Sequence, residues 1–228
     1  MNVVYSLTKH VYEWMLPSIR SLAEHHPDTK VFIICEDDEF PLELPIDAEI
    51  INATNQRWFP EIGVNYHNGF KYINLLKVMY PTLLWGVDKV IHLDIDTIIA
   101  DKLDDFWNMD LTDKWVAAVP EYRAGYRPFG NTYYNMGVAL INLDQMRKDN
   151  IEPIMAGYLN VVKQPYADQD AWNKYGIQFN KMVTADLRFN ENVCTGFTDK
   201  PAIVHYCGDK GWWTNKSLYR REYLERYL

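Results

Sequence analysis

A buried strand that runs into two aspartates organises this chain: Lys89-Val-Ile-His-Leu-Asp94-Ile-Asp96-Thr-Ile-Ile-Ala100. The apolar run before the first aspartate is typical of a strand with both faces covered. Because side chains alternate along a strand, Asp94 and Asp96 share one side where that strand ends. Paired carboxylates in apolar surroundings need a positive partner, and Mg²⁺ or Mn²⁺ seeks such oxygens together with phosphate oxygens. For an Asp-x-Asp alone, the alternative is a strand-end turn with two solvated side chains.

The chain before this strand alternates between strands and helices. Apolar runs at residues 2–5 and 30–35 predict strands, residues 14–25 have helical spacing, and residues 46–51 predict a third, short strand. Strand–helix–strand units build parallel sheets, so the aspartate pair is expected at the carboxyl end of a parallel strand, where open α/β sheets bind ligands. A further helix is predicted over 70–84, and its apolar stripe contains Lys77, which is unusual for an unpaired lysine.

The chain after residue 100 adds more strands, more helices and one polar loop. Strands are predicted at 115–119, 133–142 and 202–206, and helices at 143–149 and 154–162, in a short helix that starts with the segment 166–173, and at 218–228. The loop 121–131 is a candidate lid or acceptor surface, or an ordered surface loop. There is no internal repeat or linker in the sequence, so we expect a single domain over 1–228.

Composition and charge argue against a nucleic-acid partner. The formal net charge of the 228 residues is −8 and the pI is near 5.2, so no basic footprint is present. The cysteines Cys35, Cys194 and Cys207 have no paired spacing, which favours reduced thiols and a cytoplasmic location. No window of the sequence approaches the ~20 apolar residues of a membrane span.

Three further polar motifs stand beside apolar runs. They are Asn135-Met-Gly137, Asp168-Gln169-Asp170 and His205-Tyr-Cys-Gly208. A lone histidine at a strand end is more often structural, but an imidazole beside two carboxylates makes an open metal site with room for phosphates. Asp94, Asp96 and His205 are therefore the candidate metal ligands.

With these motifs together, the sequence resembles family 8 of the glycosyltransferases, the family of glycogenin and of bacterial lipooligosaccharide galactosyltransferases. The resemblance covers nearly the whole chain, and the order of its motifs is more specific than any one of them. The motifs are Ser6-Leu7-Thr8 with Tyr12, the helix of Lys77, His92-Leu-Asp94-Ile-Asp96-Thr97, Tyr134-Asn135-Met-Gly137-Val-Ala-Leu-Ile-Asn142-Leu143, Asp168-Gln169-Asp170 and His205-Tyr-Cys-Gly208.

The resemblance implies a single α/β domain of the GT-A type, with a mixed, mostly parallel central sheet flanked by helices. Residues 1–100 would be its nucleotide-binding half, and residues 101–228 its sugar and acceptor half with a C-terminal helix. The implied donor is a UDP-sugar, UDP-glucose or UDP-galactose, and the implied acceptor is a hydroxyl of a glycan, glycolipid or protein.

The resemblance also implies a role for each motif. Mn²⁺, or Mg²⁺, would be held by Asp94, Asp96 and His205 and would bridge the two phosphates. The implied donor contacts are Leu7, Thr8 and Tyr12 to uracil and ribose, Lys77 to the donor, Asn135 with Gly137, Asp168 and Gln169 around the sugar, and Gly208 with Lys210 at the diphosphate. Two departures weaken parts of this set: Lys210 follows Gly208 one residue earlier than in the family pattern, and Lys9 and His10 stand where many members carry an acid.

The family retains the anomeric configuration of the sugar. The metal would act as a Lewis acid on the leaving UDP while an oxocarbenium-like sugar forms. We favour same-face attack, in which the leaving phosphate helps to deprotonate the acceptor, Gln169 supports the cationic sugar and Asp168 orients its hydroxyls. The competing route is a covalent sugar on Asp168 or Asp170.

Other functions fit single motifs. Asp94-Ile-Asp96-Thr97 matches the opening of haloacid-dehalogenase-type phosphohydrolases, with Asp94 as nucleophile, although that motif normally lies on the first strand. A non-catalytic nucleotide-sugar-binding module is a second alternative. A nucleotidyltransferase would more commonly carry a Gly-rich, basic loop after its first strand, and residues 6–10 contain no glycine. The aromatic and basic tail 212–228 predicts a helix that caps the sheet, or a peripheral contact with an anionic membrane.

Overall fold

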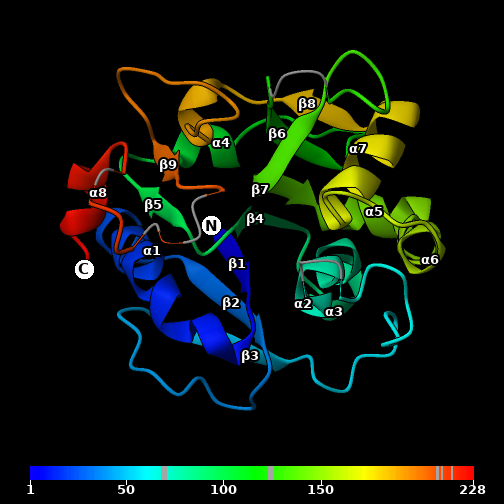
Figure 1. Cartoon of the computed structure of the whole chain (residues 1–228), viewed down its shortest axis with the longest axis horizontal. Helices are drawn as coiled ribbons and strands as arrows, with labels where there is room; N and C mark the ends of the chain where they lie inside the picture. The colour runs from blue at the N-terminus through cyan, green and yellow to red at the C-terminus, as the bar shows by residue number, and fades with distance from the viewer. Residues whose placement is uncertain (68–70, 123–125, 209–210, 212, 217) are drawn as a thin grey trace.

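A seven-stranded mixed sheet forms the centre of the computed structural model (Figure 1). The structure describes all residues except 68–70, 123–125, 209, 210, 212 and 217. The strands of this sheet are β1 (Asn2–Ser6), β2 (Lys30–Cys35), β3 (Ala48–Asn52), β4 (Lys89–Leu93), β6 (Val116–Pro120), β7 (Tyr134–Asn142) and β8 (Met182–Thr184). Their order is β3-β2-β1-β4-β7-β6-β8, and among these strands only β7 runs against the others. The predicted mixed, mostly parallel sheet is confirmed.

Helices cover both faces of the sheet. They are α1 (Tyr12–His25), α2 (Tyr72–Leu75), α3 (Tyr80–Leu83), α4 (Asp104–Trp107), α5 (Leu143–Asp149), α6 (Glu152–Val161) and α7 (Asp168–Gln178), with 3₁₀ turns η1 (Lys9–Val11), η2 (Leu76–Met79) and η3 (Leu187–Phe189). Val3 and Tyr5 of β1 pack with α1 and α4 on one face, whereas Val4 packs with α2, α3 and α5 to α7 on the other. This alternation is why the strands are apolar throughout.

The predicted helix over 70–84 is divided into α2, η2 and α3, and Phe70 lies outside the described residues. Pro81 is in the first turn of α3; its ring cannot donate a backbone hydrogen bond, and it crowds the preceding turn. The interruption leaves Lys77 in the 3₁₀ turn η2, with its side chain buried.

A second, two-stranded sheet stands beside the main one. It pairs β5 (Thr97–Ile99) with β9 (Ile203–His205) in antiparallel register, so that Thr97 lies opposite His205. A small core of its own joins this sheet to α8 (Arg221–Glu225). The pairing brings the C-terminal part of the chain to the turn that carries Asp96, although Thr97 and His205 are 108 positions apart in the sequence.

The C-terminal segment caps this small sheet. The predicted helix over 218–228 is shorter in the structure, because Arg220 before α8 has a left-handed backbone with φ of 54°. Arg220 pairs with the buried Glu191 at 2.8 Å, and Arg226 pairs with Glu24. These pairs favour the capping interpretation of the tail, and its contact with a membrane stays a prediction. Within the described parts of the chain, no helix has the length and apolar character needed to cross a bilayer.

Candidate active site

Asp94, Asp96 and His205 meet at the carboxyl end of β4. One ligand atom from each lies within 4.8 Å of the other two. His205 Nε2 is 3.3 Å from Asp96 Oδ1 and 3.9 Å from Asp94 Oδ2. Two carboxylates and an imidazole are a donor set suited to Mn²⁺ or Mg²⁺, with positions left for phosphate oxygens.

Strand geometry explains why these groups meet. His92 and Asp94 follow Val90 at intervals of two residues, so all three project toward the face covered by η2 and α3. The Asp94 N–H donates to the carbonyl of Gly137 at 2.7 Å, which joins the strand end to β7. The pairing of Thr97 with His205 places the imidazole, the third candidate ligand, next to Asp96.

The buried side chain of Asn190 orients the His205 imidazole. His205 Nδ1 lies 2.9 Å from Asn190 Oδ1, and an amide oxygen can only accept, so the Nδ1 proton is donated there. His205 Nε2, the other ring nitrogen, is therefore directed at the two aspartates. Asn190 in turn donates to Asn135 at 2.8 Å. Such supporting contacts fix ligand orientation in metal sites.

Gly137 provides the space that this donor set needs. A Cβ at this position would be 2.3 Å from His205 Cε1 and 2.6 Å from Asp94 Oδ2, closer than real contacts allow. Any other residue at 137 would displace the candidate ligands.

The charges around His205 also fit a bound cation. Burial disfavours the charged form of His205, but Asp96 and Asp94 outweigh burial and raise the pKa of the imidazole. A bound metal ion would take the place of the proton that the two aspartates favour.

Lys77 lies between two carboxylates. Its Nζ is 2.7 Å from Asp94 Oδ1 and 3.8 Å from Asp168 Oδ2. Burial opposes the charge of the lysine, but the two aspartates outweigh burial and raise its pKa. This ion pairing accounts for a lysine on an apolar stripe.

His92 supports the same corner in its neutral form. Its ring nitrogens lie 3.0 Å from Asp94 Oδ1 and 3.0 Å from the Tyr80 hydroxyl. Burial and the nearby Lys77 lower the pKa of His92 to about 4. For Asp94, burial acts against ionisation, but Lys77 and His92 more than offset it, and its pKa is lowered. Asp94 is thus ionised and its second oxygen, Oδ2, faces His205.

Asp168 begins α7 on the far side of Lys77. Its Oδ2 is buried without a hydrogen-bond partner. Burial raises the pKa of Asp168 to about 7, against the opposing effect of Lys77. The preceding Ala167 has φ of 49° and ψ of −118°, a strained conformation for a residue with a Cβ and one that concentrates at functional sites. An unpartnered buried oxygen beside a lysine is a ready acceptor for a ligand hydroxyl.

Gln169 and Asn135 meet at a glutamate that the sequence analysis did not single out. Glu121 Oε1 accepts from Asn135 Nδ2 at 2.6 Å and lies 3.3 Å from Gln169 Nε2. The carboxylate is almost fully buried. Gln169 Oε1 also accepts from the Met136 N–H at 2.9 Å. Glu121 follows β6 directly, so a search for polar residues at strand ends would have found it.

Asp170 has a different setting from Asp168. Its Oδ1 accepts from the hydroxyls of Tyr126 and Tyr133, both at 2.8 Å, and its Oδ2 accepts from the Tyr166 N–H at 2.8 Å. With three hydrogen bonds and full burial, Asp170 holds together the loop before β7 and the start of α7. These contacts favour a structural role for Asp170 over direct participation in catalysis.

The remaining predicted donor contacts lie along the same edge. Leu7, Thr8 and Tyr12 are buried beyond the end of β1, and the Tyr12 hydroxyl donates to Asp37 at 3.0 Å. Gly208 is exposed three residues after His205, with φ of 87°. Lys210 lies outside the described residues.

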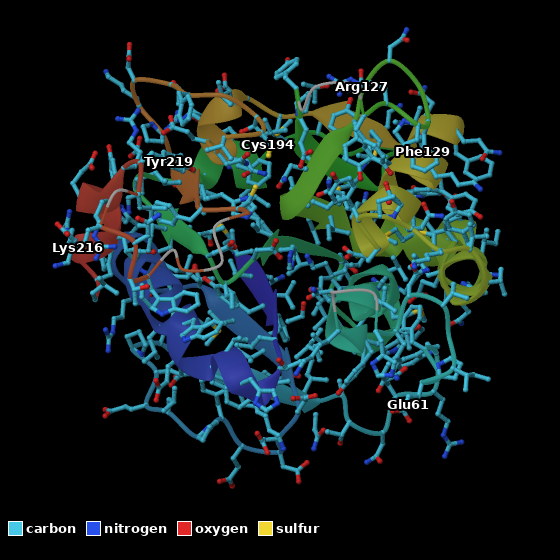
Figure 2. The ribbon with its side chains drawn as sticks, in the orientation of Figure 1. Glu61, Arg127, Phe129, Cys194, Lys216 and Tyr219 are labelled. Carbon is cyan, nitrogen blue, oxygen red and sulfur yellow. The ribbon has the colours of Figure 1, made fainter. Side chains whose placement is uncertain are left out.

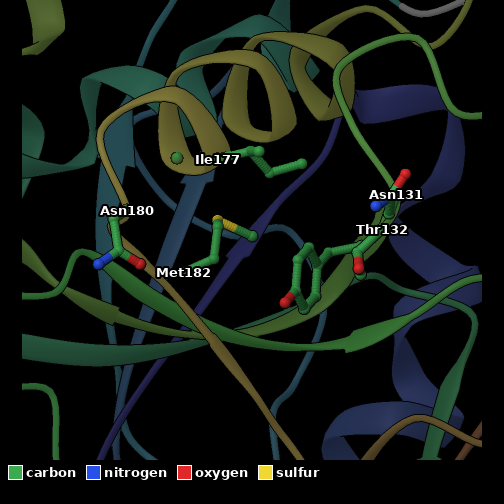
Figure 3. Close-up of a pocket in the computed structure, with 7 residues that line it drawn as sticks. Asn131, Thr132, Ile177, Asn180 and Met182 are labelled. Atoms are coloured by element: carbon green, nitrogen blue, oxygen red, sulfur yellow. The ribbon is translucent and has the colours of Figure 1, made fainter.

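A separate hollow of about 180 Å³ lies between the C-terminal half of α7 and β8 (Figure 3). Its lining residues are Asn131, Thr132, Tyr134, Gly176, Ile177, Asn180 and Met182. The lining contains no carboxylate, imidazole, thiol or amine, so it offers neither a metal site nor an acid–base pair.

Three comparisons bear on this arrangement. The family model described as Glycosyl transferase family 8 matches residues 2–216. A Haemophilus influenzae protein named as a candidate glycosyltransferase is 26% identical, over 95% of this chain and 74% of its own. Glycosyltransferase GlyA of Streptococcus pneumoniae is 28% identical over 92% of this chain, which spans 32% of GlyA. The galactosyltransferase LgtC, solved with donor and acceptor sugar analogues, has the same fold, with a TM-score of 0.77 at 21% identity over 100% of this chain and 95% of LgtC. The chain belongs to glycosyltransferase family 8.

Proposed function

We propose that this glycosyltransferase moves a hexose, glucose or galactose, from a UDP-sugar to an acceptor hydroxyl with retention of configuration and with the help of Mn²⁺ or Mg²⁺. The observation that carries the proposal is the convergence of Asp94, Asp96 and His205 beside the Lys77–Asp168 pair. Residues 1–100 would bind the nucleotide, and residues 101–228 the sugar and the acceptor.

Asp94, Asp96 and His205 would hold the divalent cation, which when bound supplies positive charge against the departing UDP. Lys77 would add a second, fixed positive charge on the donor side. Because this lysine is already held by Asp94, little reorganisation would be needed as charge develops on the leaving group. Leu7, Thr8 and Tyr12 would contact uracil and ribose, and Gly208 with Lys210 the diphosphate.

The residues at the start of α7 would handle the sugar. Asp168, with its unpartnered Oδ2, would accept from a sugar hydroxyl. Gln169, held by Met136 and Glu121, would present its amide to the developing cationic sugar, with Asn135 beside it. In the same-face route, the leaving phosphate takes the acceptor proton. Asp170 would keep this region in place through Tyr126 and Tyr133.

The phosphohydrolase and binding-module alternatives make different predictions for Asp94. A nucleophilic Asp94 would have to attack with an oxygen, but Oδ1 is held by Lys77 and His92 and Oδ2 faces His205. A binding module would retain UDP-sugar without turnover.

The test is release of UDP from a panel of UDP-sugars with Mn²⁺, with and without sugar acceptors. We expect Asp96→Ala to lower turnover by about 10²–10³-fold, the loss typical for one electrostatic contact to the leaving group. Asp28→Ala, at an exposed aspartate far from the site, is the matched control. Unchanged turnover in Asp96→Ala would contradict the proposal, and hydrolysis of a simple phosphate ester in place of UDP release would favour the phosphohydrolase.

A further inference from the structure

Two thiols face each other close to the candidate metal site. Cys207 Sγ lies 3.9 Å from Cys194 Sγ, with its S–H directed at Cys194. Both side chains are half-buried, whereas Cys35, in β2, is fully buried. In the view of Figure 2, Cys194 lies between β9 and β7. The chain therefore has one partly exposed cysteine pair and one buried cysteine.

The pair spans two segments that support the His205 ligand. Cys194 lies in a tight turn closed by pairing of Asn192 with Gly196, and its N–H donates to Asn192 Oδ1 at 2.8 Å. Cys207 follows His205 by two residues. Asn192 Nδ2 donates to Asn190 Oδ1 at 2.9 Å, the same oxygen that accepts from His205. Two side-chain amides, those of Asn192 and Asn190, therefore connect Cys194 to the imidazole of His205.

We propose that Cys194 and Cys207 are a redox-modification site, which small-molecule disulfides convert into a reversible protein disulfide that weakens metal binding by His205. A disulfide bond of about 2.05 Å requires the two sulfurs to approach by nearly 2 Å from their present separation. The turn at Cys194 and the segment from Cys207 to the exposed Gly208 would take up that shift. Pairs of this kind in reducing compartments are typically transient and sensory.

The exchange balances without a further co-reactant. The Cys194 thiolate attacks one sulfur of the small disulfide, which forms a mixed disulfide and releases one small thiolate. Cys207 gives its proton to that thiolate and attacks the Cys194 sulfur, which forms the protein disulfide and releases the second small thiol after protonation. The net change is oxidation of two protein thiols and reduction of one disulfide to two thiols.

The first experiment exposes the full chain to glutathione disulfide and counts thiols, with peptide mapping under non-reducing conditions. Wild type and Cys35→Ser should each lose two thiols, linked as Cys194–Cys207, and dithiothreitol should restore them. Cys194→Ser and Cys207→Ser should form no intramolecular disulfide. A trivalent arsenical, which binds paired thiols, should label wild type and Cys35→Ser only. Stable glutathionylation of Cys194 without the internal bond, or a bond that includes Cys35, would overturn the proposal.

The second experiment measures Mn²⁺ affinity alone, by electron paramagnetic resonance of free Mn²⁺. We expect oxidation to weaken binding by about 10-fold in wild type, the lower end of effects from contacts that orient a ligand, and to leave Cys194→Ser unchanged. An oxidised wild type with unchanged Mn²⁺ affinity would refute the coupling to His205. The coupling to His205 rests on the proposed metal site, so reduced wild type that binds no Mn²⁺ would contradict the proposed function, whereas the thiol count tests the disulfide independently of that function.

Discussion

Lys77 separates two carboxylates of opposite character. On the strand side, Asp94 follows β4, pairs with Lys77 at 2.7 Å and has a lowered pKa. On the helix side, Asp168 begins α7, lies 3.8 Å from the same lysine, and has a pKa raised by burial to about 7. The residue type is the same, but a closer cation and the neighbouring His92 make Asp94 a permanent anion, whereas Asp168 titrates near neutrality. The first suits a metal, and the second suits a sugar hydroxyl.

Replacing Lys77 removes the cation that Asp94 and Asp168 share, and it should have the largest effect on stability. Lys77→Met leaves the buried Asp168 and the half-buried Asp94 without their cation, so we expect a loss of up to about 3–5 kcal/mol in the free energy of unfolding. Urea denaturation without added metal measures it. Adding Asp168→Asn should restore part of the loss, since one of the two charges is then gone.

Lys148→Met is the control for Lys77→Met, because Lys148 pairs with Asp144 on the exposed surface of α5. Its effect should stay below about 1 kcal/mol. Equal stabilities of Lys77→Met and wild type would mean that Asp94 and Asp168 do not depend on the lysine.

Asn190→Ala tests metal binding on the strand side of Lys77, where Asp94 and His205 lie. Without the amide that accepts from His205 Nδ1, the imidazole loses its fixed orientation, and we expect Mn²⁺ affinity to fall by about 10–100-fold. Calorimetric titration with Mn²⁺ measures the change. Asp168→Asn is the comparison variant, because it alters the other side of Lys77 and should leave Mn²⁺ affinity close to that of wild type.

The pH dependence of stability tests the raised pKa of Asp168, on the helix side of Lys77. The folded pKa of Asp168, about 7, lies above that of an unfolded aspartate, so the folded chain binds more protons and loses stability as pH rises toward 7. Asp168→Asn removes this loss. We expect the variant to gain on the order of 2 kcal/mol relative to wild type between pH 5 and pH 8. Denaturation curves at both pH values test this, and an identical difference at both would place the pKa of Asp168 outside that range.

The fold was largely predictable because its signals are local. Apolar runs marked β1, β2, β4 and β7, and helical spacing marked α1 and α5, since each element buries a continuous stripe or face. The short edge strand β8 and the pairing of β5 with β9 were missed. Three-residue strands carry little periodicity, and their partners lie far apart in sequence.

The candidate site was predictable only in part, for the same reason. Asp94, Asp96 and His205 were recognised from motifs, and the structure brings them together. Glu121 and Asn190 stand alone in sequence, and only tertiary contact reveals their places beside Asn135 and His205. Asp170 shows the converse, because its motif did not reveal that two tyrosines and a backbone N–H occupy it.

The most direct test of the central claim is UDP affinity with and without Mn²⁺, measured by calorimetry on wild type and Asp96→Ala. The account predicts that Mn²⁺ tightens UDP binding to wild type by at least about tenfold, or 1.4 kcal/mol, and that Asp96→Ala abolishes this gain. UDP binding that Mn²⁺ leaves unchanged in wild type would contradict it.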